Sequence, residues 1–211
     1  MGGESLKFEI SPGIVPSVLA TLGPGEAVYA EHGVVLWKEA PVKVDRKTIK
    51  SGGILSSAKR YTVGGIPFFL TEFQGPGMVS FSRDGVGELR ELELKNGETL
   101  EVGEGSLVCA TAEVRYEAIY VSGTAGRMGI WMDQFTGPGH IVIHANGNLV
   151  TMNLQAGEKV VCEKRAILHK TPTMKLTPFI QKVGEGLRGT AMSQEMYEIE
   201  GPGRVALQTG R

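Results

Sequence analysis

Residues 19–44 read LATLGPGEAVYAEHGVVLWKEAPVKV, and the same spacing of apolar residues, glycine and glutamate occurs twice more in the chain. The two further copies are LELKNGETLEVGEGSLVCATAEVRY at 92–116 and MNLQAGEKVVCEKRAILHKTPTMKL at 152–176. In every copy a leucine stands three residues before a glycine, and a glutamate follows that glycine directly. A pattern that recurs along a chain indicates a repeated supersecondary unit.

The tripeptide Gly-Pro-Gly occurs four times, at 23–25, 75–77, 137–139 and 201–203. Proline holds φ near about −65°, and the flanking glycines adopt dihedral angles closed to other residues, so each tripeptide predicts a defined corner. Apolar and polar residues alternate after these corners, as is typical of a β-strand. The glycines that we expect to form the structural turns are Gly25, Gly75, Gly77, Gly97, Gly137, Gly139, Gly157, Gly201 and Gly203.

The composition favours many short strands over helices. The 211 residues include 30 glycines, about twice the average usage of roughly 7%, and each glycine inside a helix costs about 1 kcal/mol. We therefore expect one all-β domain over 1–211, with three internal repeats at about 14–70, 71–132 and 133–199 and a closing C-terminal strand at 201–209. Each repeat is predicted to be an antiparallel meander of about four strands, and the three together a sandwich or prism with pseudo-threefold symmetry.

The charge balance bears on which partners the protein can bind, and the cysteine content bears on the cellular compartment. With 22 Lys and Arg against 23 Asp and Glu, the formal net charge is −1, so no electrostatic argument supports nucleic-acid or anionic-membrane binding. No secretory leader and no transmembrane segment is recognised, and we expect a cytoplasmic protein. Cys109 and Cys162 are expected to be buried free thiols, with a single disulfide as the alternative.

The sequence patterns that usually mark a metal site or a dinucleotide-binding site are incomplete in this chain. His140 and His144 are four residues apart, which in a strand places them roughly 13 Å from each other, too far to share one metal ion. The segment GEGLRG at 184–189 has dinucleotide-loop spacing but lacks a βαβ context, so we interpret it as a repeat loop. We expect no catalytic residue, no metal and no cofactor, and therefore a protein that is not an enzyme.

A positively charged side chain lies in each of the three glycine-rich loops that precede the Gly-Pro-Gly corners at 75–77, 137–139 and 201–203. If the repeats bring these loops together, they would form an anion pocket for a small anionic ligand; the alternative is a set of solvated loop arginines. The candidate residues are Arg60, Arg127, Arg188 and Lys59.

The repeats also differ in charge. Residues 84–117 hold nine acidic side chains against three basic ones, and residues 163–188 hold six basic against two acidic. This difference predicts a head-to-tail contact between subunits of a homo-oligomer, acidic repeat against basic repeat, with ordinary surface scatter as the alternative. The aromatic residues are too sparse for a nucleic-acid stacking platform, and we expect Trp37, Trp131, Phe68 and Phe69 in the core.

Three segments carry a resemblance to a known family: PGEAVYAEHGVVLW at 24–37, SGGILSSAKRYTVGGIPFFLTEFQGPG at 51–77 and GPGRVALQTGR at 201–211. Together they resemble the Altered Inheritance of Mitochondria protein twenty-four family along essentially the whole chain. The resemblance implies a triplicated fold like that of the tryptophan RNA-binding attenuation protein, with no established catalytic residues. The chain has Gly65-Ile66-Pro67 where the family has a Gly-Glu-Ser-like sequence. Any role of that acidic residue in the family is therefore not transferred to this chain. Eukaryotic relatives are mitochondrial, a location that we do not transfer because no transit peptide is recognised.

Taken together, these observations predict a non-enzymatic, oligomer-forming scaffold or small-ligand binding module. The alternative is a regulator that binds RNA or a small molecule, which rests on analogy between folds alone.

Overall fold

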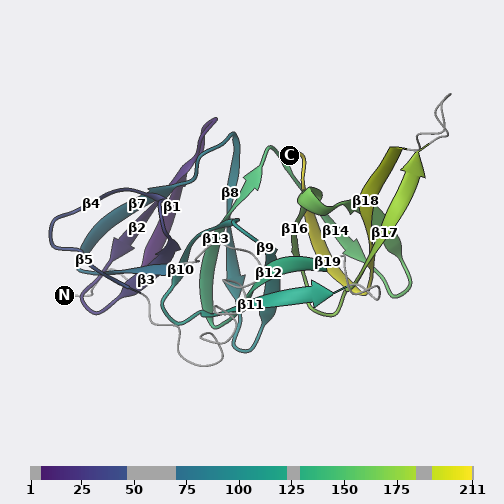
Figure 1. The fold of residues 1–211 in the computed structure, drawn as a ribbon. Helices are drawn as coiled ribbons and strands as arrows, with labels where there is room; N and C mark the ends of the chain where they lie inside the picture. Colours follow the sequence, from purple (N-terminus) through teal and green to yellow (C-terminus); the bar gives the residue numbers. More distant parts are fainter. Residues whose placement is uncertain (1–5, 47–69, 123–128, 184–191, 211) are drawn as a thin grey trace.

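The fold is known from a computed structural model that describes residues 6–46, 70–122, 129–183 and 192–210. In these residues the protein is all-β, as predicted: it contains antiparallel strands, one short 3-10 turn (η1, Lys164–Ala166) and no α-helix. Strand β1 (Lys7–Ser11) comes first, and three sets of six strands follow it (Figure 1).

The first set comprises β2 (Ser17–Leu22), β3 (Ala27–Glu31), β4 (Val35–Lys38), β5 (Lys43–Arg46), β6 (Leu70–Gln74) and β7 (Gly77–Ser82). The second set comprises β8 (Gly87–Leu94), β9 (Thr99–Gly103), β10 (Leu107–Thr111), β11 (Arg115–Ser122), β12 (Gly129–Thr136) and β13 (Gly139–Asn146). The third set comprises β14 (Leu149–Leu154), β15 (Lys159–Glu163), β16 (Ile167–Lys170), β17 (Lys175–Val183), β18 (Met192–Glu200) and β19 (Gly203–Gln208).

Strand pairing follows the same pattern in every set. The sixth strand pairs with the first and the third, and the fifth strand pairs with the second and the fourth. The predicted meander of about four strands is therefore wrong, because only the fourth and fifth strands of a set are neighbours both in sequence and in a sheet. The physical reason is that the other connections carry the chain from one sheet to the next.

The last three Gly-Pro-Gly corners lie at the change of sheet between the fifth and sixth strands, whereas the first, at 23–25, lies between β2 and β3. The amide of Gly137 donates a 2.9 Å hydrogen bond to the carbonyl of Glu98, which follows the turn glycine Gly97, so two turns of one set lie against each other. A Cβ on Gly137 would collide with the carbonyl oxygens of Leu94 and Lys95, whereas Gly97 has φ of 77° and open space around it. The peptide bonds before Pro76, Pro138 and Pro202 are cis.

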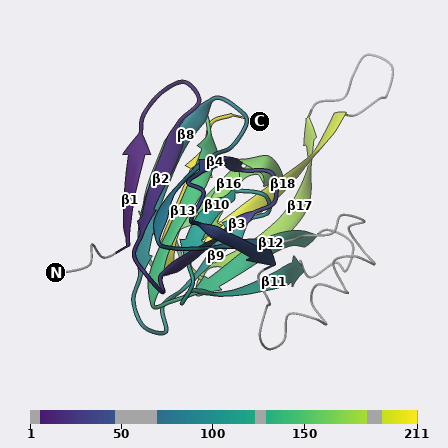
Figure 2. The ribbon, with the colours of Figure 1, turned by 90° about the vertical axis from the view of Figure 1, so that its left-hand side faces the viewer.

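The strands form four sheets. Two sheets have six strands, in the orders β5-β6-β3-β10-β13-β8 and β11-β12-β9-β16-β19-β14. The other two are smaller, with the orders β1-β2-β7-β4 and β15-β18-β17. Figure 2, turned toward the end of the molecule that carries β4, shows β1 and β2 side by side at its edge.

Three clusters of buried side chains fill the spaces between successive sheets. Because side chains alternate along a strand, the inner strands contribute to two of these cores at once. Val28 and Ala30 of β3 lie in the first core, and Tyr29 between them lies in the second. The inner strands of the six-stranded sheets are thus packed on both faces, and Leu107–Thr111 is buried at every position.

Candidate functional site

The residues of the predicted anion pocket fall outside the described part of the chain. Arg60, Arg127, Arg188 and Lys59 lie in the segments that join the fourth and fifth strands of the three sets. The anion pocket stays a prediction. Among the predicted turn glycines, six have positive φ: Gly25, Gly77, Gly97, Gly139, Gly157 and Gly203.

Two neighbouring cavities open between the strand sets: the larger lies where the second and third sets meet, and the smaller extends toward the first set. The larger, of about 620 Å³, is lined by Trp131, Lys164 and Arg165 together with acidic side chains that include Glu195. The smaller, of about 410 Å³, is lined by polar groups that include Arg83 and shares part of its wall with the larger one. The shared wall consists of Glu104, Ser106, Asn146 and Gln208.

Arg83 joins the first strand set to the second. Its guanidinium forms an ion pair with Glu31 at the end of β3 and donates a 2.9 Å hydrogen bond to the carbonyl oxygen of Leu107 on β10. Burial lowers the pKa of Arg83, and burial together with the charge of Arg83 lowers the pKa of His144, which holds that imidazole neutral. Arg83 thus links the end of β3 in the first set to β10 in the second.

The two histidines of β13 differ in environment. His140 lies at the surface with its Nδ1 atom 2.8 Å from the Oε1 atom of Glu91, whereas His144 is buried. Within the described residues, no group of three His, Cys, Asp or Glu side chains is arranged to hold a metal ion.

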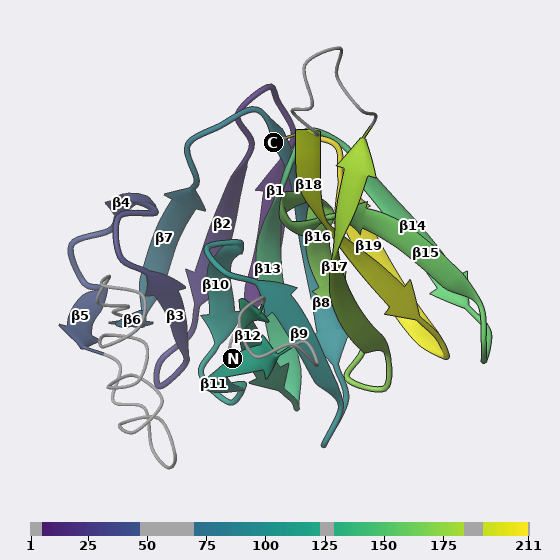
Figure 3. The same ribbon diagram turned by 45° about the vertical axis from the view of Figure 1, so that its right-hand side comes forward.

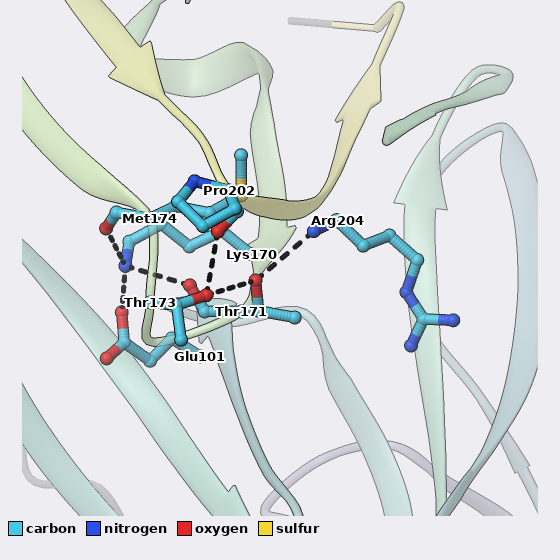
Figure 4. Close-up of polar contacts among 7 residues, drawn as sticks. All are labelled: Glu101, Lys170, Thr171, Thr173, Met174, Pro202 and Arg204. Atoms are coloured by element: carbon cyan, nitrogen blue, oxygen red, sulfur yellow. Dashed lines mark hydrogen bonds and ion pairs between the residues drawn. The ribbon is translucent and has the colours of Figure 1, made fainter. Parts of the chain in front are cut away.

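The second strand set meets the third through a buried ion pair (Figure 4). The Nζ atom of Lys170 on β16 lies 2.5 Å from the Oε2 atom of Glu101 on β9, and it also donates a 3.1 Å hydrogen bond to the carbonyl of Met174. Glu101 belongs to the acidic region 84–117 and Lys170 to the basic region 163–188. The structure thus brings one pair from these two regions together inside a single chain.

The strands β4 and β15 differ most from their counterparts in the other sets. Strands β10 and β16, which correspond to β4, each pair on both sides, as do β3 and β9, which correspond to β15. Among the described strands, β4 pairs only with β7 and β15 only with β18. We call the unpaired sides of β4 and β15 the two open edges, and Figure 3 shows them at opposite ends of the molecule.

Large apolar side chains are exposed at both open edges. Leu36 and Trp37 on β4 are 59% and 47% exposed, and Val161 on β15 is 49% exposed. The prediction that Trp37 belongs to the core is therefore wrong, because none of the described strands pairs with β4 on its outer side. Trp131 is half-buried beside Tyr120, and Phe68 and Phe69 lie outside the described residues.

The two cysteines are free and buried, as predicted. Burial, with a smaller contribution from the charge of Glu163, raises the pKa of Cys162 to about 11. Burial also raises the pKa of Cys109. Neither thiol is a thiolate at neutral pH, so neither is an activated nucleophile.

A comparison with protein families matches residues 8–210 to the family described as mitochondrial biogenesis AIM24. The chain belongs to the AIM24 family. The fold of this AIM24-family chain is also similar to the crystal structure of the protein SPYM3_0169 from Streptococcus pyogenes, with a TM-score of 0.73 and 16% sequence identity, covering 97% of this chain and 94% of that one. At this identity the likeness concerns the fold alone. The comparison with curated proteins gives no match.

Two further findings concern the described part of this chain. In the described part of the AIM24-family chain, none of the helical structure is long and apolar enough to cross a membrane. The open edges were missed by sequence reasoning, because VVLW at 34–37 is as apolar as the equivalent segments that are paired on both sides.

Proposed function

We propose that this AIM24-family protein is a non-enzymatic scaffold that assembles with other copies of itself. One observation carries the proposal: the sheets at both ends stop at a strand whose counterparts inside the molecule are paired on both sides and buried. Exposed apolar edge strands are uncommon in monomeric proteins, because an unpaired row of backbone groups recruits another strand.

The proposed architecture of this scaffold is a triplicated prism of the tryptophan RNA-binding attenuation protein type. The threefold recurrence of one pairing scheme supports it. We propose a single domain over 1–211 whose repeats, counted from the sequence, span about 14–70, 71–132 and 133–199, with the closing strand at 201–209. The buried free thiols support a reducing compartment, and we propose the cytoplasm.

Light scattering coupled to size exclusion tests self-assembly, over a hundredfold range of protein concentration. We expect a mass above the 22.6 kDa of one chain, rising with concentration or constant for a closed assembly. A mass of one chain at every concentration would overturn the proposed scaffold.

Small-ligand binding is a second candidate function, and the larger cavity favours it. Its volume of about 620 Å³ suits a small organic molecule, and it presents the indole of Trp131 beside the cations Lys164 and Arg165. This candidate function includes a regulator that binds a small molecule. No observation on the described residues favours a regulator that binds RNA.

Thermal-shift screening of small aromatic carboxylates and phosphates tests this second candidate. We expect stabilisation that is lost in Arg165→Ala and kept in Arg127→Ala. Loss in Arg127→Ala instead assigns the anion site to the predicted loop pocket of Arg60, Arg127, Arg188 and Lys59, and no stabilisation by any probe excludes the candidate.

A further inference from the structure

Each six-stranded sheet consists of two halves that come from successive strand sets. One half has the order fourth, fifth and second strand of a set, as in β5-β6-β3; the other has the order third, sixth and first strand of the next set, as in β10-β13-β8. The halves join where the second strand of one set pairs with the third strand of the next, at β3·β10 and at β9·β16.

The two smaller sheets are these same halves without their complements. The sheet β17-β18-β15 is a half of the first kind, and β4-β7-β2, extended by β1, is a half of the second kind. The open edge of β15 is the edge that β3 and β9 use, and the open edge of β4 is the edge that β10 and β16 use. A chain of three sets therefore ends in two complementary halves.

The shape of β4 already matches that of the paired strands. The ladder between β4 and β7 shifts its register between Val35 and Trp37, and the equivalent ladders shift between Leu107 and Cys109 and between Ile167 and His169. A shift of this kind is a β-bulge, which redirects the backbone groups on the other side of the strand. The outer side of β4 thus has the same irregularity as the strands that accept a neighbour.

Burial of the equivalent side chains shows what the open edges lack. Leu36 corresponds to Val108 and Leu168, and Trp37 corresponds to Cys109 and His169; these four counterparts are buried. Val161 on β15 corresponds to Tyr29 and Glu101, which are also buried. In each case the neighbouring set supplies the covering strand.

We propose that copies of this chain join head to tail by pairing β15 of one copy with β4 of the next. This inference rests on the proposed self-assembly and names its interface. The pairing is antiparallel and joins the half-sheets into one continuous sheet of the order β17-β18-β15-β4-β7-β2-β1. The occupant of each open edge is a second copy of this chain, because only the repeat itself supplies the complementary half.

The internal junctions also define the register. In β3·β10, Cys109 is opposite Ala30 and Ala110 is opposite Tyr29; in β9·β16, His169 is opposite Val102 and Lys170 is opposite Glu101. The same spacing from the turn glycine places Trp37 opposite the partner's Cys162 and Lys38 opposite the partner's Val161. Trp37 then extends the partner's third core, to which Cys162 belongs.

The contact is heterologous, since two different edges meet. Such contacts produce a ring when the rotation between copies closes and an open filament when it does not. A pairing of two β4 strands, or of two β15 strands, would instead produce a two-fold dimer.

Directional disulfide formation tests the pairing and its register. Variants Lys38→Cys and Val161→Cys are both made with Cys162→Ser, because Cys162 is a free thiol on the same strand as Val161. The two are mixed under mild oxidation, since paired residues about 4.5–5.5 Å apart at Cα suit a disulfide. We expect a cross-linked dimer in the mixture and none with either variant alone. A mixture of Lys38→Cys with Lys159→Cys, in the same Cys162→Ser background and two residues out of register, should cross-link at least tenfold less.

A charged residue at the open edge provides the second measurement. Trp37→Lys is expected to reduce the assembly to single chains, while the matched control Val86→Lys, at a position 64% exposed in the turn before β8, should leave it intact.

The outcomes separate the two proposals. If wild-type protein assembles but Trp37→Lys assembles equally and the mixture does not cross-link, this interface is overturned and the scaffold proposal stands. Cross-linking of Lys38→Cys alone would show a two-fold contact and also overturn the interface. A wild-type protein that is a single chain at every concentration overturns both.

Discussion

The Nζ atom of Lys170 lies 2.5 Å from the Oε2 atom of Glu101, and both side chains are almost fully buried between the second and third strand sets. Strand β4 also has a lysine at this position, Lys38, but the equivalent of Glu101 on β15 is Val161. The β9·β16 junction therefore has an ionic contact that is lacking both in the β3·β10 junction, where Ala110 is opposite Tyr29, and in the proposed junction between copies.

Removal of one partner of this ion pair should destabilise the protein strongly. Lys170→Met leaves the carboxylate of Glu101 buried without its cation, and we expect the free energy of unfolding to fall by about 3–5 kcal/mol. The double variant Lys170→Met, Glu101→Leu should recover most of that loss, because an apolar pair fills the same space. Urea unfolding measures both values; a double variant no more stable than the single one would contradict the account.

Equivalent leucines should differ in their contribution to stability. Leu168 is fully buried in the second core, so Leu168→Ala should cost about 2–5 kcal/mol. Leu36 occupies the same place in the first set but is exposed, so Leu36→Ala should cost less than about 1 kcal/mol in dilute protein. Thermal unfolding of both variants at low concentration checks the contrast, and equal costs would show that β4 is covered within a single chain.

Acidification should weaken the fold through His169. Burial, and then the charge of Arg204, lowers the pKa of His169 from 6.5 to about 4, so in this range protons bind mainly to the unfolded chain. The stabilising effect of the neutral imidazole is complete above pH 6.5 and falls as the pH drops toward 4. Between about pH 7 and pH 5 this single group should remove about 2 kcal/mol of unfolding free energy.

The variant His169→Gln isolates this effect, since it keeps a polar side chain that does not titrate. Wild-type protein and variant are compared by urea unfolding at each pH. We expect the difference between their unfolding free energies to change over that window; a constant difference would show that His169 does not sense pH.

Two turn glycines should respond differently to the same substitution. Gly97→Ala requires only that alanine adopt a positive φ, at a cost of about 1–2 kcal/mol. Gly137→Ala also places a methyl group against two backbone carbonyls, so it should cost about 1–3 kcal/mol more. Chemical unfolding of the two variants decides; a Gly97→Ala variant as unstable as Gly137→Ala would contradict the close approach of the corners.

Local features of the chain were predictable because they depend on backbone chemistry. Turns at Gly25 and Gly97, and strands on either side of them, follow from the dihedral freedom of glycine and the alternation of apolar residues. The number of strands per unit was not predictable in this way. Strands as short as Val35–Lys38 and Lys43–Arg46 leave too few residues for alternation to be recognised.

The sequence by itself determined the all-β class, the position of the turn glycines, the burial of both thiols and the family. Those properties arise from residue type and from spacing along the chain. Only the tertiary structure decided which strands pair, because equivalent segments such as VLW at 35–37 and LVC at 107–109 are both apolar but have different neighbours. Trp37 is exposed and Cys109 is buried for one reason: β10 pairs with β3 of another set, whereas among the described strands β4 pairs only with β7 of its own set.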